Sequence, residues 1–433
     1  MVPHLITALS GPLNELEQRI LDATPVIERW FRLEWMEHTP PLYAAVDIRN
    51  AGFKLAAVDT SLYPDGWQNL SPDTLPLAVQ AAQAAIEKIC PEARNLLVVP
   101  ENGKLGNAYL ANLARLKEVF GMAGLNVRFG SVDPALKRAT TFTLPGGDTL
   151  TLEPAQRTRY RLGLKHFDPC TILLNNDLAA GAPGILEELH EQYLLPPLQA
   201  GWSVRRRSQH FRCYEEVSKR FGKLLGIDPW LMYPLFAACP AAEPHERASV
   251  DALATQVDAL LAKVRRKYKE YGITEKPYVV IKADQGMRDA PLLTVRDAKE
   301  LHALLPLKPA RGKPAALPAG DLVVQEGVLT NERIHDAVAE PVVYTLDRYV
   351  VGGFYRVHAD RGTHEGLSAA DTHFVPLAFD GSAQLPRPGA RGGVSAPNRF
   401  YMYGVIGRLG LVAASYEMEA TDPEMQDLTE PSR

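Results

Sequence analysis

The sequence predicts a soluble α/β protein of several lobes, and three observations indicate that class. The chain has 433 residues, whereas one domain usually holds about 100–200. Hydrophobic residues make up 46% of it and charged residues 23%, the balance of a globular protein. Strand-like segments alternate with helical patterns early in the chain and with proline- and glycine-rich loops late in it. We expect an N-terminal α/β lobe at 1–165, a mostly helical region at 166–275, a third region at 276–420 and a flexible tail at 421–433.

Strand-like and helical segments alternate in the first region. The segments 43–50 and 53–62 have strand composition and are separated by an alanine and a glycine. Short apolar strands at 95–100 and 125–130 flank a helix whose apolar residues recur at helical spacing. Such a β-α-β unit usually pairs its strands in parallel. A hairpin is expected at 142–152, around two adjacent glycines.

Helical patterns dominate the second region. Segments 182–194, 204–225 and 248–271 all carry them, and the last is the most regular, with apolar residues every three or four positions. Gly272 then supplies a stop signal. We therefore expect three helices between the first and third regions.

Two polar groups in the second region are candidates for substrate binding. Asn175 and Asn176 follow an apolar run, at a strand end where α/β proteins place ligand-binding residues, although an ordinary polar turn explains them equally well. Arg205 and Arg206 could capture substrate carboxylates, which suit the guanidinium fork. The alternative is a solvated helix face. With Arg207 there are three consecutive arginines, and at most about two can face one site, because successive helix residues point in different directions.

Polar residues end or interrupt the apolar segments of the third region. Lys282 ends the strand-like run "YVVIK", and the loop after it contains Gly286. Gln325 and Glu326 interrupt the run "LVVQEGV". Arg356 lies on the return strand of a predicted hairpin, "VVYTLDRYVVGGFYRVH". A lysine at the end of a buried strand is unusual, and the cations here suggest a site for an anion.

Motifs spread over nearly the whole chain resemble the proteobacterial type of glutamate–cysteine ligase, within the ATP-grasp superfamily. The resemblance rests on "LLNNDLAAGAP", "GWSVRRRSQHF", "IDPWLMYP", "IKADQGM", "VVQEGV", "DRYVVGGFYRVH" and "APNRFYMYGVIGRLG". It implies an ATP-grasp-like fold, in which two C-terminal lobes clamp ATP, so that 276–420 would be the nucleotide-binding region. It also implies ATP-dependent formation of γ-glutamylcysteine through an acyl phosphate.

The same resemblance implies roles for individual residues. Lys282 would contact the ATP phosphates, and the loop with Gly286 would lie over the nucleotide. Arg356 would neutralise the phosphoryl group in transfer, so that Lys282 and Arg356 are the expected catalytic residues. Asn398 would be a ligand of Mg²⁺. A lysine that reaches past the strand end to solvent is the alternative for Lys282.

The resemblance also implies a hinge strand and two lids. The backbone from Gln325 to Val328 would read the adenine edge, and Glu326 would take the ribose hydroxyls or the amino group. The alternative for Glu326 is a charge that protects an edge strand from aggregation. The long loops 306–320 and 380–398 are the lid candidates, since loops of this length are uncommon in compact domains.

Composition excludes several classes of protein. The net charge of −4 gives no basic field for nucleic acid or a membrane surface. The four cysteines lie far apart without zinc-site spacing, and the start of the chain does not read as a signal peptide. We therefore expect a cytoplasmic enzyme whose partners are small molecules, and its oligomeric state stays open. Two alternatives are another ATP-grasp ligase or carboxylate kinase with a different acid and amine, and a non-catalytic nucleotide-binding protein.

Overall fold

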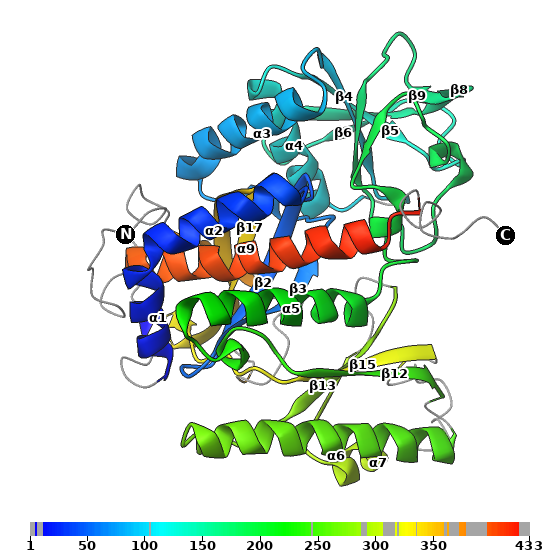
Figure 1. Cartoon of the computed structure of the whole chain (residues 1–433). Coiled ribbons are helices and arrows are strands. Elements are labelled where there is room, and N and C mark those ends of the chain that lie inside the picture. Colours follow the sequence, from blue (N-terminus) through cyan, green and yellow to red (C-terminus); the bar gives the residue numbers. More distant parts are fainter. Residues whose placement is uncertain are drawn as a thin grey trace, which may run out of the picture.

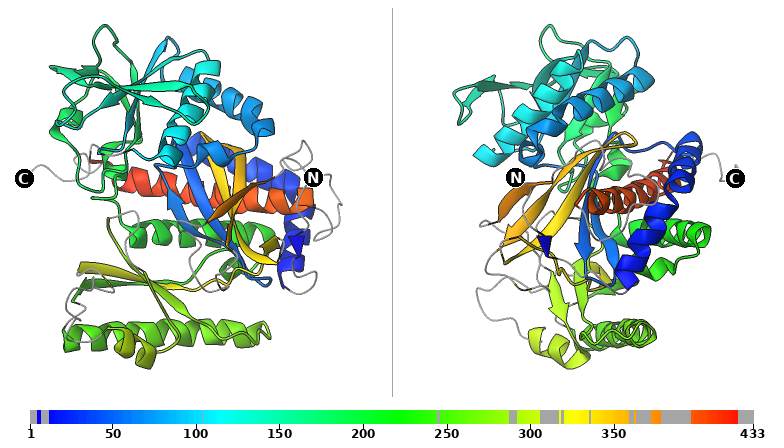
Figure 2. Two further views of the ribbon diagram at one scale, coloured as in Figure 1. Left: turned by 180° about the vertical axis from the view of Figure 1, so that it is seen from behind. Right: turned by 90° about the vertical axis from the view of Figure 1, so that its left-hand side faces the viewer.

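The structure is a computed structural model that describes most of the chain. The described residues are 5–6, 12–103, 105–243, 246–286, 292–305, 317, 320–334, 336–358, 362, 372–377 and 396–423. The predicted lids 306–320 and 380–398 and the predicted tail 421–433 lie almost wholly outside them. Within the described residues the chain forms three tiers, each built around a β-sheet (Figures 1 and 2). This mixed architecture confirms the predicted α/β class.

The upper tier holds a six-stranded sheet in the order β11-β10-β4-β5-β7-β6 and a small two-stranded ribbon. Its elements are α3 (Leu75–Ile89), β4 (Asn95–Pro100), α4 (Asn107–Met122), β5 (Asn126–Ser131), β6 (Thr140–Thr143), β7 (Thr149–Pro154), β8 (Gln156–Thr158), β9 (Arg161–Gly163), β10 (Thr171–Asn175) and β11 (Tyr193–Leu195). β4 and β5 pair in parallel around α4, and β6 and β7 form an antiparallel hairpin. Both pairings confirm the predictions for this region.

The central tier joins segments from both ends of the chain into a seven-stranded sheet (Figure 2). Its strands are β1 (Leu5–Ile6), β2 (Tyr43–Asn50), β3 (Leu55–Ser61), β16 (Arg333–Ile334), β17 (Ala337–Leu346), β18 (Tyr349–His358) and β19 (His373–Pro376). Its helices are α1 (Pro12–Asp22), α2 (Thr24–Glu37), α5 (Arg207–Leu225) and α9 (Ala396–Ala420). α9 packs on β2, β3 and β17 and lies beside α5, and most of its residues from Phe400 to Ser415 are buried (Figure 1).

The lower tier holds a four-stranded antiparallel sheet in the order β12-β15-β13-β14. Its elements are β12 (Phe236–Ala242), α6 (Arg247–Glu270), β13 (Val279–Ala283), β14 (Leu293–Val295), α7 (Ala298–Leu304) and β15 (Gly320–Glu326). α6 covers one face of this sheet, and apolar residues of both fill the space between them (Figure 1). The helix predicted at 248–271 is confirmed as α6.

One predicted helix is wrong. Residues 182–194 form a short 3₁₀ turn at Gly184–Leu186 and then enter β11, which pairs in parallel with β10. Pro183 and the neighbouring glycines disfavour a continuous helix, and pairing with β10 supplies the backbone bonds instead. The lobe boundaries stay a prediction, but the seven-stranded sheet pairs 43–50 with 337–346, across the boundary placed at 165.

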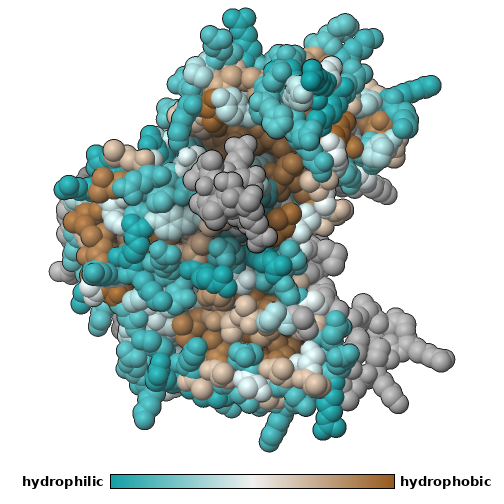
Figure 3. Space-filling model, turned by 45° about the vertical axis from the view of Figure 1, so that its right-hand side comes forward, coloured by the Kyte–Doolittle hydropathy of each residue, from teal (hydrophilic) through white to brown (hydrophobic). Residues whose placement is uncertain are grey.

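The surface is mostly polar. On the face in Figure 3, hydrophilic residues cover most of the molecule, and hydrophobic ones gather where the upper tier meets the central tier. None of the helices in the described part of the chain is long and apolar enough to cross a membrane.

Candidate active site

One face of the seven-stranded sheet carries a cluster of charges. Val46 of β2 belongs to the core beneath α9, so its neighbours in the strand, Asp47 and Arg49, point to the opposite face. On that face, Arg49 Nε donates to Glu340 Oε1 at 2.9 Å, and Arg356 Nη1 donates to Asp47 Oδ2 at 2.7 Å. The charges therefore come from three adjacent strands, β2, β17 and β18.

A β-bulge on β3 connects this charged face to the lower sheet. Asp47 pairs with Asp59, and the register then shifts so that Val58 is an extra residue. The carbonyl oxygen of Val58 accepts a bond from Lys282 Nζ at 3.2 Å and one from Gln325 Nε2 at 3.3 Å. Bulges redirect backbone and side-chain groups and are frequent beside active sites. This one turns Val58 and Asp59 toward β13 and β15.

Lys282 lies between the two sheets. Its neighbour Ile281 packs in the core beneath α6, so Lys282 points to the other face of β13, where it is half-buried. Burial lowers the pKa of its ammonium, and the nearby Arg207 and Arg49 lower it further, although Asp59 opposes them. The side chain donates to a carbonyl inside the molecule, which disfavours the alternative of a lysine that reaches to solvent.

Arg356 lies between two carboxylates. Besides the bond to Asp47, its Nη1 is 4.0 Å from Glu340 Oε2. These acids hold the pKa of the guanidinium above its ordinary value, although burial alone would lower it. The pKa of Asp47 is raised, first by burial and then by the negative charges of Glu340 and Asp59, despite Arg356. The cluster thus holds several carboxylates around a permanent cation.

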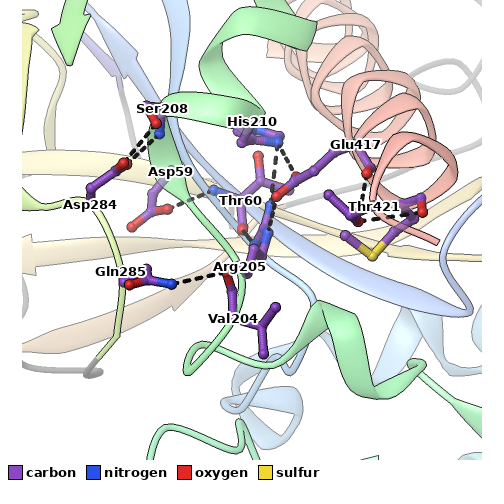
Figure 4. A network of polar contacts seen from close by, with 11 residues as sticks. Asp59, Thr60, Val204, Arg205, Ser208, His210, Asp284, Gln285, Glu417 and Thr421 are labelled. Atoms are coloured by element: carbon purple, nitrogen blue, oxygen red, sulfur yellow. Dashed lines mark hydrogen bonds and ion pairs between the residues drawn. The ribbon is translucent and has the colours of Figure 1, made fainter. Parts of the chain in front are cut away.

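The residues around the meeting point of the charged face and β13, which include Asp47, Asp59, Lys282 and Arg356, are called the cleft below. Arg205 is held in a buried network and does not face this cleft. Its Nε and Nη2 donate to the two carboxylate oxygens of Glu417 at 2.8 and 2.9 Å, and its Nη1 donates to Thr60 O at 2.6 Å. His210 Nδ1 lies 2.9 Å from Glu417 Oε2 (Figure 4). Burial would raise the pKa of Glu417, but Arg205 and His210 outweigh it and hold it at about 2. The guanidinium joins β3, α5 and α9, which leaves little capacity for a substrate.

Arg206 lies at the surface. It forms an ion pair with Asp321 and approaches Asp284 at 3.8 Å, and its side chain is 47% exposed. Such an exposed pair contributes little to stability. Arg206 lies beside the residues that follow β13, where a ligand could reach it. A binding role for Arg206 stays a prediction.

Asn175 links the upper tier to the central tier, and Asn176 forms a local turn. Asn175 Nδ2 donates to Tyr43 Oη at 3.0 Å, and its Oδ1 accepts from Asn112 Nδ2 at 3.0 Å. Asn176 Oδ1 accepts from the amide of Leu178 at 3.0 Å, as in an Asx turn. Both side chains are buried. The geometry of Asn176 therefore favours the polar-turn alternative, and a substrate contact of either residue stays a prediction.

Glu326 is part of the core and not of the cleft. Its carboxylate accepts from Lys54 Nζ at 2.8 Å, from Trp230 Nε1 at 3.1 Å and from the amide of Leu235 at 2.8 Å. The residue is 1% exposed. A contact with ribose or adenine would require the loss of bonds in a dry environment, where each lost bond is expensive. The carboxylate is therefore engaged within the core of this structure, and its contact with the ribose stays a prediction.

The backbone of the predicted hinge strand is also engaged. β15 lies between β12 and β13, the amide of Gly327 donates to Tyr278 O at 2.8 Å, and Val328 O accepts from Tyr278 Oη and Arg49 Nη1. Little backbone from Gln325 to Val328 is left to read an adenine edge. The adenine position stays a prediction.

Two further predicted residues lie at the border of what is described. Gly286 has a φ of +86°, which favours glycine, and the residue before it bonds to the segment that precedes α5, from Gln285 Nε2 to Val204 O at 3.3 Å. Its contact with nucleotide stays a prediction. Asn398 lies in the first turn of α9, but its side chain is outside the described part of the chain.

The described residues contain no group of three or more His, Cys, Asp or Glu side chains arranged to hold a metal ion. Asp47 and Glu340 both approach the guanidinium of Arg356. Their oxygen atoms are of the kind that Mg²⁺ prefers.

Two residues of the cleft, Asp47 and Asp59, were missed by sequence reasoning, and a third, Arg207, was considered only as one of three consecutive arginines. The two acids end identical tetrapeptides, "AAVD" at 44–47 and 56–59, and they pair across β2 and β3. The repeated aspartate in two apolar segments could have indicated that both acids belong to one polar site. Which of the three arginines lies near the cleft depends on the residue at which α5 begins. A run of three arginines does not reveal that residue.

Comparison with known proteins identifies relatives of nearly the whole chain. A crystal structure of a provisionally named gamma-glutamylcysteine synthetase from Methylobacillus flagellatus KT is 48% identical, with a TM-score of 0.89 over 98% of this chain and 100% of that one. A D-alanyl-alanine synthetase A from Vibrio cholerae is 12% identical, with a TM-score of 0.33 over 66% of this chain and 75% of that one, too low to argue from. No curated protein matches. The profile described as "Glutamate-cysteine ligase" matches residues 17–418, and the chain belongs to that family of ligases.

Proposed function

We propose that this ligase joins the side-chain carboxylate of L-glutamate to the amine of L-cysteine and converts ATP to ADP and phosphate. The product is γ-glutamylcysteine, and the reaction is the first step of glutathione synthesis. The support is the family match over 17–418 and the 48% identity to the Methylobacillus protein. A carboxylate is a poor acyl donor at neutral pH, so ATP first converts it to an acyl phosphate. The cysteine amine then attacks the acyl carbon, and phosphate leaves.

The triphosphate is placed between the charged face of the seven-stranded sheet and β13. Lys282 and Arg356 approach this space from opposite sheets, and transfer of a phosphoryl group requires fixed cations around its oxygens. Lys282 is half-buried between the two sheets, and a bound nucleotide would cover it further from water. Such surroundings protect an acyl phosphate from hydrolysis.

The nucleotide would be accompanied by Mg²⁺, whose chemistry is to neutralise phosphate oxygens and hold them in line. Asp47 and Glu340 are the described residues whose oxygens suit this ion, together with the predicted ligand Asn398. Since Arg356 lies between the two acids, it would hold the phosphates close to the same carboxylates. We place the enzyme in the cytoplasm, with small molecules as its partners.

A single observation carries the assignment of the site: Lys282 and Gln325 of the lower sheet meet the bulge of β3 at one carbonyl oxygen, beside Asp47 and Arg356. The test measures phosphate release from ATP with purified enzyme and a panel of acid and amine pairs, with the dipeptide quantified in parallel. We expect phosphate and γ-glutamylcysteine in equal amounts with L-glutamate and L-cysteine. Faster turnover with a different pair, or phosphate release without any amine product, would reject the proposed reaction.

A further inference from the structure

The side chains of Asp59 and Arg207 are a carboxylate and a guanidinium near the cleft, and neither is engaged in an ion pair within 4 Å among the described residues. Asp59 is half-buried, and its Oδ1 accepts only the amide of the next residue, Thr60, at 2.9 Å. Burial would raise the pKa of Asp59, but Arg207, Lys282 and Arg205 outweigh it and lower the pKa. A permanently ionised carboxylate thus has cations around it that do not touch it.

Arg207 is held in place while part of its guanidinium stays unused. Its backbone amide donates to Asp284 O at 2.8 Å, its Nη1 donates to Ala283 O at 2.9 Å, and the ring centre of Trp202 lies 4.3 Å from its Cζ. Its Nε is buried without a hydrogen-bond partner. A buried, unsatisfied donor on a charged group is unfavourable unless a ligand completes it.

We infer that Asp59 and Arg207 form a subsite for the α-ammonium and α-carboxylate of one amino-acid substrate. An ammonium pairs with the carboxylate of Asp59, and a carboxylate accepts from the Nε of Arg207 through charge-assisted bonds. Lys282 acts electrostatically on Asp59, so the subsite adjoins the proposed phosphate position. The inference rests on the proposed function, since it assigns a substrate of that reaction to this site.

The chemistry of the reaction identifies the amino acid as glutamate. Cysteine reacts through its α-amine, which must lose its proton before attack, and a carboxylate such as Asp59 would hold that amine in the protonated state. Glutamate reacts through its side-chain carboxylate, so its α-ammonium and α-carboxylate take no part in bond formation. Both groups can then be clamped throughout the reaction, while the side chain extends toward Lys282.

Two glutamate analogues separate the two contacts. Glutarate keeps the reacting carboxylate but lacks the α-ammonium, and 4-aminobutyrate keeps it but lacks the α-carboxylate. Both should have kcat/KM values below that of L-glutamate in the wild type. Loss of one charge-assisted contact should raise KM on the order of 10- to 100-fold. In Asp59→Asn the preference for L-glutamate over glutarate should disappear and the preference over 4-aminobutyrate should remain. In Arg207→Gln the reverse should hold.

Arg212→Gln is the matched control, because Arg212 is exposed on the same helix and only donates to Gln209 Oε1 at 3.0 Å. It should leave all three preferences unchanged. The KM value for cysteine should also be unchanged in Asp59→Asn and Arg207→Gln. If either variant raises KM for cysteine instead, or if both analogue preferences survive, the glutamate subsite is rejected. Should Asp59→Asn fail to fold in a melting experiment, Arg207→Gln with 4-aminobutyrate still decides the assignment.

Calorimetry separates this inference from the proposed function. L-glutamate and both analogues are titrated into each variant in the presence of MgCl₂ and a non-hydrolysable ATP analogue, so no turnover is needed. Glutamate binding that depends on Asp59 and Arg207, in an enzyme that forms no dipeptide, would keep the subsite and reject the reaction. Dipeptide formation with unaltered glutamate binding in both variants would keep the reaction and reject the subsite.

Discussion

Two sets of buried charges in this molecule differ in how completely they are paired. In the core set, Lys54 bonds to Glu326 and Arg205 to Glu417, and each carboxylate accepts at least three hydrogen bonds or close polar contacts. The cleft set consists of Lys282, Asp59 and Arg207. Among the described residues, Lys282 makes a single bond to a backbone carbonyl, and neither Asp59 nor Arg207 forms an ion pair within 4 Å. Buried charges are expensive unless they are paired, so a fully paired set can serve the fold alone. The incompletely paired set is suited to charged ligands.

The largest effect is expected from a variant that breaks an ion pair of the core set. Lys54→Met should lower the free energy of unfolding by ~3–5 kcal/mol, because it leaves the Glu326 carboxylate buried without its counter-ion. The measurement is urea denaturation at pH 7. Glu326→Gln in the same chain removes the stranded charge and keeps an acceptor for Trp230 and Leu235, so the double variant should recover most of the loss. A single variant as stable as the wild type would show that the pair is not structural.

The same replacement of lysine by methionine in the cleft should lower activity but not stability. Lys282→Met should reduce kcat by roughly 10²–10³-fold, as expected for the loss of one group that stabilises charge in the transition state. Its melting temperature should not fall, because burial already disfavours the charged form of this lysine. Turnover and melting curves on the same preparation provide the measurement. Normal turnover in a folded Lys282→Met enzyme would remove this lysine from the phosphate site.

The pH dependence of stability tests the second pair of the core set. The pKa of Glu417 is held at about 2 in the folded state, below its ordinary value of 4.5. A lowered pKa gives stability that is present above 4.5 and is lost as the pH falls toward 2, a loss of about 3 kcal/mol. Glu417→Gln should be less stable than the wild type at pH 7 but should lose less on acidification. The measurement is the free energy of unfolding of both proteins between pH 5 and pH 2. An equal loss in the two proteins over this range would contradict the prediction.

The contrast between the two sets also explains what the sequence could reveal. Lys282 was predictable because a cation at the end of an apolar strand is visible locally. The ion pair of Glu326 with Lys54 was not predictable, because the two residues lie 272 positions apart in the chain. The arginine run predicted that at most about two of its members face one site, and the start of α5 at Arg207 decides how each of them is oriented. The β-α-β unit was local and was predicted, whereas the strand at Tyr193–Leu195 depends on its pairing with β10.

The smallest expected effect lies at the border of the two sets, at Gly327. A Cβ on this residue would lie 2.1 Å from Cε2 of Tyr278, far inside normal contact distance. The ring cannot easily move, because its hydroxyl donates to Val328 O at 2.8 Å and is 3.3 Å from Arg49 Nη1. Gly327→Ala should therefore cost ~1–3 kcal/mol of stability, as overpacking in a core usually does.

Gly327→Ala should also disturb the cleft, through the contacts of Tyr278. Displacement of Tyr278 would release Arg49, which pairs with Glu340 of the charged face. Gly327→Ala should thus lower kcat modestly as well as the melting temperature. Gly121→Ala is the matched control, since Gly121 lies in α4 with no atom within 4 Å of the added Cβ, and alanine favours a helix. If both alanine variants melt like the wild type, the ring of Tyr278 is not fixed, and the core and cleft sets are less firmly coupled than their hydrogen bonds indicate.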